Sequence, residues 1–463
     1  MLRLNLADQN LKILLLIVLV IMGIAAGIFI SIHGFSPLIA AAPFALVFFL
    51  LTINKPWIAL FLFFLLVPLE NLYVLEGSYH ATSTKLVGGY LVFLVLITGN
   101  FRYLPEIFKN KKALWIIGFM LASVISILFS DIQSLLFGNL IRLLILLSLY
   151  FVLILMIRDI TTLKYCFIAL ILGGVLSVLS PIVLGFGRVG GSSLERYGGL
   201  WGDQNVFAAI LLTILPLSLV FFLKERKRLY KIIFAAVFLI ILGGFFLTYS
   251  RGGFIAFLFL AIITLYKVLK NKHRTKILLV AIPLMIAMSA VFYNTVADNY
   301  ISRVESLRAL QKNSPEITES SLNKRYIYYF KIAPKLFSEN PIFGTGIGGF
   351  RHYNTYYDQN SHNTYLEILT GTGIIGFIPF MMILYLSWRE LKKVQYASRH
   401  IKDLSLLYYY STALELGFLA LLITGLFIVL DFNKILWLSV VFSSVMINIL
   451  RNYTKAQTHA GSY

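Results

Sequence analysis

Residues 205–223 read NVFAAILLTILPLSLVFFL, a run without a single charged side chain. A helix needs about 20 apolar residues to cross a hydrocarbon core of about 30 Å. Similar runs recur along the whole chain, in which 59% of the 463 residues are hydrophobic and only 13% are charged. Soluble domains average about 25% charged residues, so the composition predicts a polytopic membrane protein.

The expected fold class is an all-α transmembrane helical bundle. Backbone that meets lipid must satisfy its hydrogen bonds within its own segment, and no alternating pattern of barrel strands appears. The apolar runs predict about twelve to fourteen helices, with centres near residues 22, 44, 64, 92, 121, 146, 174, 213, 239, 260, 285, 375, 418 and 443. The higher number counts every run separately, although broken or re-entrant segments would lower it.

Basic residues between the runs predict the orientation, because Lys and Arg accumulate in cytoplasmic loops. When the basic loops at 109–112, 224–231, 267–276 and 389–393 share one side, that side holds 26 of the 40 Lys and Arg residues. Most of the others belong to one long segment, and long segments translocate largely regardless of charge. We therefore expect both termini in the cytoplasm. The net charge of +20 then reports topology and attraction to anionic lipid, so nucleic acid is not an expected partner.

This topology divides the chain into three parts. The expected division is residues 1–293 with helices and short outer loops (70–84, 186–203 and 249–253), a long extracytoplasmic loop at 294–363, and C-terminal helices with a cytoplasmic tail at 364–463. The long loop contains a helix-like stripe formed by Tyr326, Tyr329, Phe330, Ala333, Leu336 and Phe337. Its spacing predicts an amphipathic helix on the bilayer or on the bundle, kinked at Pro334.

Neither a nucleotide nor a metal cofactor is expected. Gly344, Gly346 and Gly349 match the G-x-G-x-x-G spacing, but that fingerprint requires a strand before it in a soluble βαβ unit. Here the loop is predicted outside the cytoplasm, so a turn packed closely against other backbone is the better interpretation. The seven histidines show no metal-ligand spacing, and the single Cys166 excludes an intrachain disulfide.

Several cations are predicted at the outer face of a chain that otherwise keeps its cations on the opposite side: Lys85, Arg196, Arg251, Arg325 and Arg351. A Lys or Arg at the end of a span is usually a snorkelling anchor. Their convergence favours a site for a phosphate or diphosphate group, because guanidinium groups bind its oxygens bidentately.

The stretch 361–377, SHNTYLEILTGTGIIGF, resembles the O-antigen ligase and polymerase superfamily, whose ligases share the pattern H-[NSQ]-x9-G-x-x-[GTY]. His362 and Asn363 are followed after nine residues by Gly373 and then by Gly376. The segment at 340–350 and the turn at 249–257 are also similar to recurring features of that superfamily. The resemblance covers about residues 195–385.

The resemblance implies a GT-C-type membrane glycosyltransferase at the periplasmic or extracytoplasmic face of the inner membrane. Its donor would be a glycan on undecaprenyl diphosphate. A ligase transfers the glycan to a sugar of lipid A core, and a polymerase transfers it to another lipid-linked repeat unit. Such enzymes use neither nucleotide nor metal.

Elementary chemistry agrees with that expectation. A neutral imidazole can accept the proton of an attacking sugar hydroxyl, which makes His362 the expected base or acceptor-orienting residue. Asn363 could orient the imidazole or open the following helix, and Gly373 and Gly376 could permit close packing. The expected diphosphate-binding residues are Arg196, Arg251, Arg325 and Arg351, assisted by Lys85.

Three alternatives remain open at this point. The complete histidine pattern favours a ligase, but a polymerase of lipid-linked units is one alternative and a protein-glycosylating member of the superfamily is another. A lipid-linked oligosaccharide flippase would share a cationic cavity, although its site would lie near the midplane between internal repeats.

Arg142 and Glu415 are ionisable residues within spans, and we expect pairing or interface roles for both.

Overall fold

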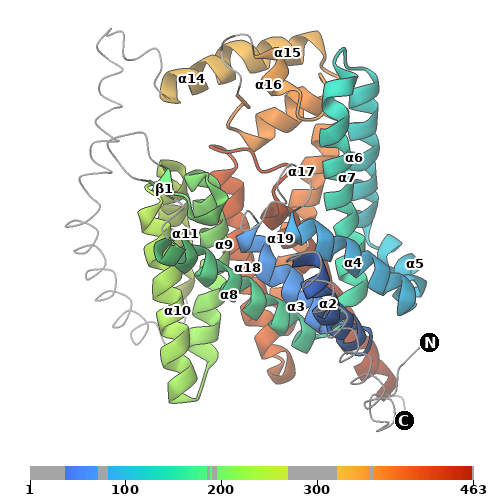
Figure 1. Cartoon of the computed structure of the whole chain (residues 1–463), viewed down its shortest axis with the longest axis vertical. Coiled ribbons are helices and arrows are strands. Elements are labelled where there is room, and N and C mark those ends of the chain that lie inside the picture. Colours follow the sequence, from blue (N-terminus) through green and yellow to red (C-terminus); the bar gives the residue numbers. More distant parts are fainter. Residues whose placement is uncertain are drawn as a thin grey trace, which may run out of the picture.

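The computed structural model describes residues 37–70, 82–184, 188–189, 196–269, 321–354, 356 and 359–460. This part is an all-α bundle, as predicted (Figure 1). Its N-terminal half consists of α2 (Pro37–Asn54), α3 (Trp57–Leu66), η1 (Val67–Leu69), α4 (Ser83–Ile97), η2 (Asn100–Tyr103), α5 (Leu104–Phe108), α6 (Lys111–Leu128), α7 (Gln133–Met156) and α8 (Ile160–Leu184).

The second half follows a two-residue hairpin, β1 (Arg188–Val189) and β2 (Arg196–Tyr197), whose strands pair antiparallel. It consists of η3 (Gly199–Trp201), α9 (Gln204–Lys224), α10 (Arg228–Leu247), α11 (Arg251–Leu269), α14 (Ser321–Ile327), the π-helical turn η6 (Tyr328–Ile332), α15 (Ala333–Glu339), α16 (Phe350–Tyr353), α17 (Thr364–Ser398), η7 (Lys402–Leu404), α18 (Ser405–Thr424) and α19 (Lys434–Ala460). In Figure 1, α14, α15 and α16 lie together at the top, and the C-terminal end of α19 points to the bottom right.

Within the described ranges, eight helices are long and apolar enough to cross a membrane, or up to ten when two bent pairs are each counted as one span. The runs centred near 44 and 64 lie in α2 and α3, which bend by 119°. With ten residues, α3 is only about 15 Å long and cannot cross alone. The structure therefore contains broken or re-entrant segments where the sequence suggested separate spans, and the runs near 22 and 285 lie outside the described residues.

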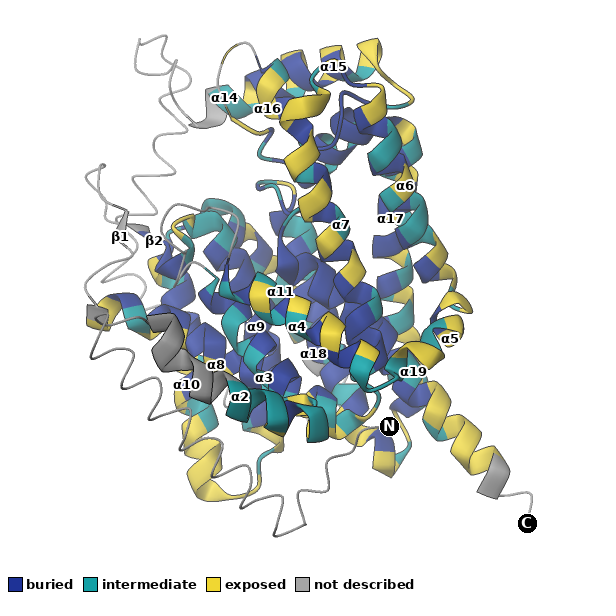
Figure 2. Ribbon diagram, turned by 45° about the vertical axis from the view of Figure 1, so that its right-hand side comes forward, coloured by how far each residue is buried: buried dark blue, intermediate teal, exposed yellow. Residues whose placement is uncertain are grey.

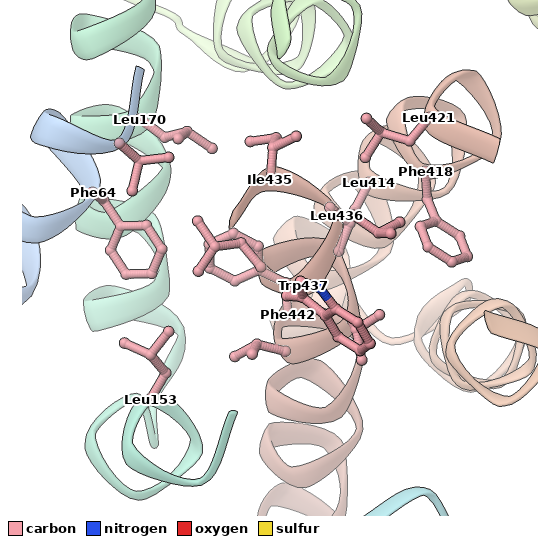
Figure 3. Close-up of a cluster of buried hydrophobic side chains, with 14 of the residues drawn as sticks. Phe64, Leu153, Leu170, Leu414, Phe418, Leu421, Ile435, Leu436, Trp437 and Phe442 are labelled. Carbon is pink, nitrogen blue, oxygen red and sulfur yellow. The ribbon is translucent and has the colours of Figure 1, made fainter. Parts of the chain in front are cut away.

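The most buried of these spans is that of α19, at 83%, although its C-terminal end is exposed (Figure 2). Side chains from α3, α7 and α8 approach it from one side and those of α18 from the other, as Figure 3 shows for Phe64, Leu170, Phe418 and Trp437. Phe64 stacks on Phe442 with ring centroids 5.2 Å apart. In contrast, only 22% of the α10 span is buried, which leaves its apolar side chains for lipid.

Two ion-pair clusters tie the helices together. Lys112, which is fully buried, lies 2.5 Å from Glu390 and also donates to the Val440 carbonyl. Glu415 forms ion pairs with Lys267 at 2.6 Å and with Lys392 at 2.7 Å. The expected pairing role of Glu415 is thus confirmed.

The glycine-rich segment 340–350 packs against a break in α17. Gly373 has φ 59° and ψ −166° inside that helix, and a Cβ atom at this position would lie 2.1 Å from the Ile342 carbonyl oxygen. Backbone hydrogen bonds join the two segments, from Thr345 N to Thr370 O and from Gly346 N to Gly371 O, both 2.9 Å. The interpretation of this stretch as a turn packed closely on backbone is confirmed.

The aromatic stripe differs in part from the prediction. The residues that are buried here are Ile327, Tyr328, Ile332, Ala333 and Leu336, packed with Phe350, whereas Tyr326 and Phe330 are exposed. The π turn at 328–332 rotates the chain relative to a regular helix, so the buried face changes register within it. Pro334 stands at the start of α15 just after that turn, where its ring disfavours continuation of a regular helix.

Candidate functional site

A cavity of about 320 Å³ lies at the end of the bundle that carries α16. Three segments far apart in the sequence line it: the start of α9, α16 with the loop before α17, and the connection between α18 and α19. The lining residues are Asp203, Val206, Arg351, Gln359, Asn360, His362, Ile428 and Val429. We call it the His362 cavity.

His362 occupies a constrained position just before α17. Its φ of 54° places it in the left-handed region, which a non-glycine residue adopts only where its surroundings hold it. Its carbonyl accepts a hydrogen bond from the Tyr329 hydroxyl at 3.3 Å, and its ring lies 6.1 Å from that of Tyr328. Burial, and next the Arg325 charge, lower the pKa of His362, so a neutral imidazole that can accept a proton is the dominant form at neutral pH.

Asn363 caps the helix that follows it. Its side-chain oxygen accepts from the backbone N–H groups of Tyr365 at 2.9 Å and Leu366 at 3.1 Å. This is an N-cap, which satisfies two of the free donors at the start of α17. Of the two roles foreseen for Asn363, the structure shows the opening of the helix, and orientation of the imidazole stays a prediction.

Arg325 and Arg351 are brought to His362 from the segment at 321–354. Arg351 lines the cavity. Arg325 donates from Nη2 to the Phe427 carbonyl at 3.2 Å, while its buried Nε has no hydrogen-bond partner among the described residues. A half-buried guanidinium with an unused donor is suited to an incoming anion.

The turn before α11 meets the same connection between α18 and α19. A Cβ atom on Gly252 would lie 2.9 Å from the Cβ of Phe427, the residue whose carbonyl binds Arg325. Ser250 Oγ donates to Asn205 Oδ1 at 2.8 Å, which joins this turn to α9. Arg251 therefore begins its helix next to the segment that forms one wall of the cavity.

The remaining two predicted cations are Arg196 and Lys85, and the structure does not bring either side chain to the cavity among the described residues. Arg196 has its backbone in β2, but its side chain lies outside the described residues. Lys85 is not among the residues that line the His362 cavity. It lies instead within electrostatic range of Arg142 and Glu70, in a cluster where Lys434 donates to Glu70 and, at 2.8 Å, to Thr84.

Two buried carboxyl groups in the segments next to the cavity lining were not anticipated. Glu367 accepts from Ser361, and both Glu367 Oε1 and Asp431 Oδ2 lack a hydrogen-bond partner within the described ranges. Burial and, secondarily, the Glu367 carboxylate raise the pKa of Asp431 to about 8. Isolated acidic residues in the apolar contexts YLEIL and VLDFN are the signal that could have identified them.

Residues 236–381 match the family model described as O-antigen ligase. This segment, less than a third of the chain, is similar to the O-antigen ligase family, which supports the superfamily that the pattern at His362 indicates. The matched segment runs from α10 into α17 and includes Arg251, Arg325, Arg351 and His362. Lys85, Arg196 and Asp203 lie outside it. No curated protein matches the chain.

The family supports a multi-pass membrane protein with glycosyltransferase activity of the O-antigen ligase type. Among the described residues, no three His, Cys, Asp or Glu side chains are grouped so that they could hold a metal ion. Independence of metal and nucleotide stays a prediction.

Proposed function

We propose that this protein transfers a glycan from an undecaprenyl-diphosphate carrier to an acceptor sugar at the extracytoplasmic face, as an O-antigen ligase acting on lipid A core. One observation carries the proposal. The His362 cavity brings a half-buried histidine together with Arg351, within the segment that matches the family, and the charge of Arg325 lies close enough to lower the pKa of His362.

The geometry supports a specific division of roles. The acceptor hydroxyl attacks the anomeric carbon of the donor, and the bond from that carbon to the diphosphate oxygen breaks. His362 accepts the hydroxyl proton, which its lowered pKa permits at neutral pH. The diphosphate leaves with the lipid, and the guanidinium groups of Arg325 and Arg351 stabilise the charge that develops on it. Arg251 and Arg196 are the next candidates for the same anion.

The test is transfer by the purified full chain in nanodiscs, supplied with an undecaprenyl-diphosphate-linked oligosaccharide. One reaction contains lipid A core and another does not, and products are identified by mass spectrometry. Glycan on the core only when core is present supports the ligase. Longer chains on the carrier without core indicate a polymerase instead.

The matched variants are His362→Ala and His352→Ala. His352 lies in α16, close in sequence, but is not among the residues that line the cavity. We expect His362→Ala to lower transfer by about 10²-fold to 10⁴-fold, the usual contribution of a general base, and His352→Ala to retain it. Wild-type transfer by His362→Ala would overturn the assignment of His362 as the base, whereas the absence of transfer by wild type with several donors would favour a transporter.

A further inference from the structure

A second cavity, of about 330 Å³, lies at the other end of the bundle, between α5, the end of α7 and the C-terminal part of α19. This is the end that the distribution of Lys and Arg predicts to be cytoplasmic. Its lining includes four cations, Lys109, Arg158, Arg451 and Lys455, against the single carboxylate of Glu106. We call it the inner basic cavity.

One face of α19 supplies half of the polar lining. Asn448, Arg451, Asn452 and Lys455 line the cavity, and their spacing of three, four and seven residues places them side by side on a helix. Asn side chains and cations alternate there, so the face offers neutral and charged donors together. Such a set is suited to a phosphate group, whose oxygens accept several hydrogen bonds at once.

The opposite wall holds a preorganised guanidinium. Arg158 Cζ lies 3.5 Å from the centre of the Tyr103 ring, and Arg102 Cζ lies 4.8 Å from the same centre. Stacking on an aromatic face fixes the plane of a guanidinium and leaves its edge donors for an anion. None of the four lining cations forms an ion pair within the part of the chain that the structure describes.

Exposed aromatic residues flank this cavity. Phe101 and Phe108 are 55% and 40% exposed, and both belong to the short helices that carry Tyr103 and Glu106. Aromatic side chains exposed at the end of a transmembrane bundle are typical of the membrane interface. A phosphate that belongs to a lipid would place its acyl chains beside them.

We propose that the inner basic cavity binds the phosphate ester of an anionic phospholipid from the cytoplasmic leaflet. Basic residues at a cytoplasmic face attract such lipids in general. The cavity differs from a diffuse patch of surface cations, because it combines the stacked guanidinium of Arg158 with a row of hydrogen-bond donors on α19. The proposal does not depend on the glycan-transfer function, since the His362 cavity lies at the opposite end of the bundle.

The test compares the full chain in nanodiscs of phosphatidylcholine with and without phosphatidylglycerol. Lipid that stays bound after extraction is counted by native mass spectrometry, and the unfolding temperature is followed in parallel. We expect the number of phosphatidylglycerol molecules retained per protein to exceed that of phosphatidylcholine by at least about tenfold. Phosphatidylglycerol should also raise the unfolding temperature, because a ligand that binds only the folded state stabilises it by mass action.

The variant Arg158→Gln/Arg451→Gln/Lys455→Gln should lose this preference. Its matched control, Arg226→Gln/Arg228→Gln/Lys231→Gln, removes two Arg and one Lys from the exposed inner loop around 224–231 and should keep it. Equal losses in both variants would show diffuse attraction and overturn the proposal. Because a triple variant can fold poorly, Asn452→Asp provides a milder test at an exposed position: the added carboxylate should weaken retention of the anionic lipid.

A third arm adds inorganic phosphate to protein in pure phosphatidylcholine. If millimolar phosphate raises the unfolding temperature of wild type, but not of the Arg158 triple variant, and phosphatidylglycerol has no effect, then the ligand is a soluble phosphate and the lipid assignment fails. Stabilisation by phosphatidylglycerol alone supports the lipid.

Discussion

Glu367 accepts two hydrogen bonds from Ser361, one from its backbone N–H at 2.9 Å and one from its hydroxyl at 2.6 Å. Ser361 Oγ also bonds to the carbonyl of Asn363 at 2.9 Å. The residue enclosed by these bonds is His362, which is held at a left-handed φ of 54°. A buried carboxyl group thus fixes the turn that presents the proposed base.

We expect Glu367→Gln to lower kcat for glycan transfer by about tenfold to a hundredfold with little change in the KM for the donor. The side chain keeps its size, but an amide replaces the carboxyl group that accepts both Ser361 bonds. A displacement of about 1 Å at a reacting group can cost about a hundredfold in rate. Steady-state kinetics with varied donor concentration separate the two parameters.

A double-mutant cycle tests whether the effect passes through Ser361. Ser361→Ala removes the hydroxyl bond, and the Ser361→Ala/Glu367→Gln enzyme should be less impaired than the product of the two single effects, because neighbours in one network are coupled. Fully multiplicative losses would contradict the positioning role. A raised donor KM without a change in kcat would contradict it as well.

Replacing Arg325 with Gln should move the acid limb of the pH–rate profile upward. The Arg325 charge is the second cause, after burial, of the lowered pKa of His362. Removing a nearby positive charge makes the imidazolium less unfavourable, so the pKa of His362 rises. Transfer would then be lost at a higher pH than in wild type as His362 becomes protonated.

The measurement is kcat/KM from about pH 5 to 8, with the unfolding temperature recorded at each pH. Lys331→Gln is the matched control, because this exposed cation lies in the adjacent π turn and does not contribute to the pKa of His362. An acid limb that stays in place in Arg325→Gln, or that shifts equally in Lys331→Gln, would rule out this coupling.

Arg351→Gln should weaken donor binding. Arg351 is the only cation that lines the His362 cavity within the described residues, and a hydrogen bond to a charged group is worth about 1.5–3 kcal/mol. The donor KM should therefore rise by about tenfold to a hundredfold. Lys335→Gln, which removes an exposed cation of α15 that is paired with Glu339, should leave it unchanged. Equal effects of both variants would mean that the outer segment attracts the donor only through its net charge.

The sequence was most informative where a residue pattern has a single structural meaning. Apolar runs of membrane length predicted the helices, and the H-N-x9-G-x-x-G pattern identified His362, which the structure places in the cavity. The loop of Gly344 and Gly346 was correctly interpreted as a turn on backbone, because positive φ and close approach are what such glycines provide.

What the sequence missed depends on contacts between distant segments. Glu367 and Asp431 are separate acidic residues until the connection between α18 and α19 closes over the start of α17, where Thr364 N donates to Gly425 O at 2.8 Å. The stripe around Tyr328 was assigned with a regular period of 3.6 residues, which a π turn breaks. Lys85 was grouped with the arginines because it is predicted on the same side of the membrane. The predicted side does not determine where on that side of the bundle a residue lies, and Lys85 lies away from the lining of the His362 cavity.

Gly373→Ala should destabilise the protein more than any comparable glycine substitution in a helix. The new Cβ would lie 2.1 Å from the Ile342 carbonyl oxygen, and the φ of 59° is strained for alanine. Strain in the left-handed region costs about 1–3 kcal/mol, and overpacking adds a similar amount. The control is Gly243→Ala in the middle of α10, where nothing lies within 4 Å of the added atom and helix propensity favours alanine. In thermal unfolding of the detergent-solubilised chain, Gly373→Ala should unfold well below wild type and Gly243→Ala at or above it. Unchanged stability of Gly373→Ala would show that α17 tolerates a regular helical turn there and that the packing of 340–350 on its backbone is dispensable.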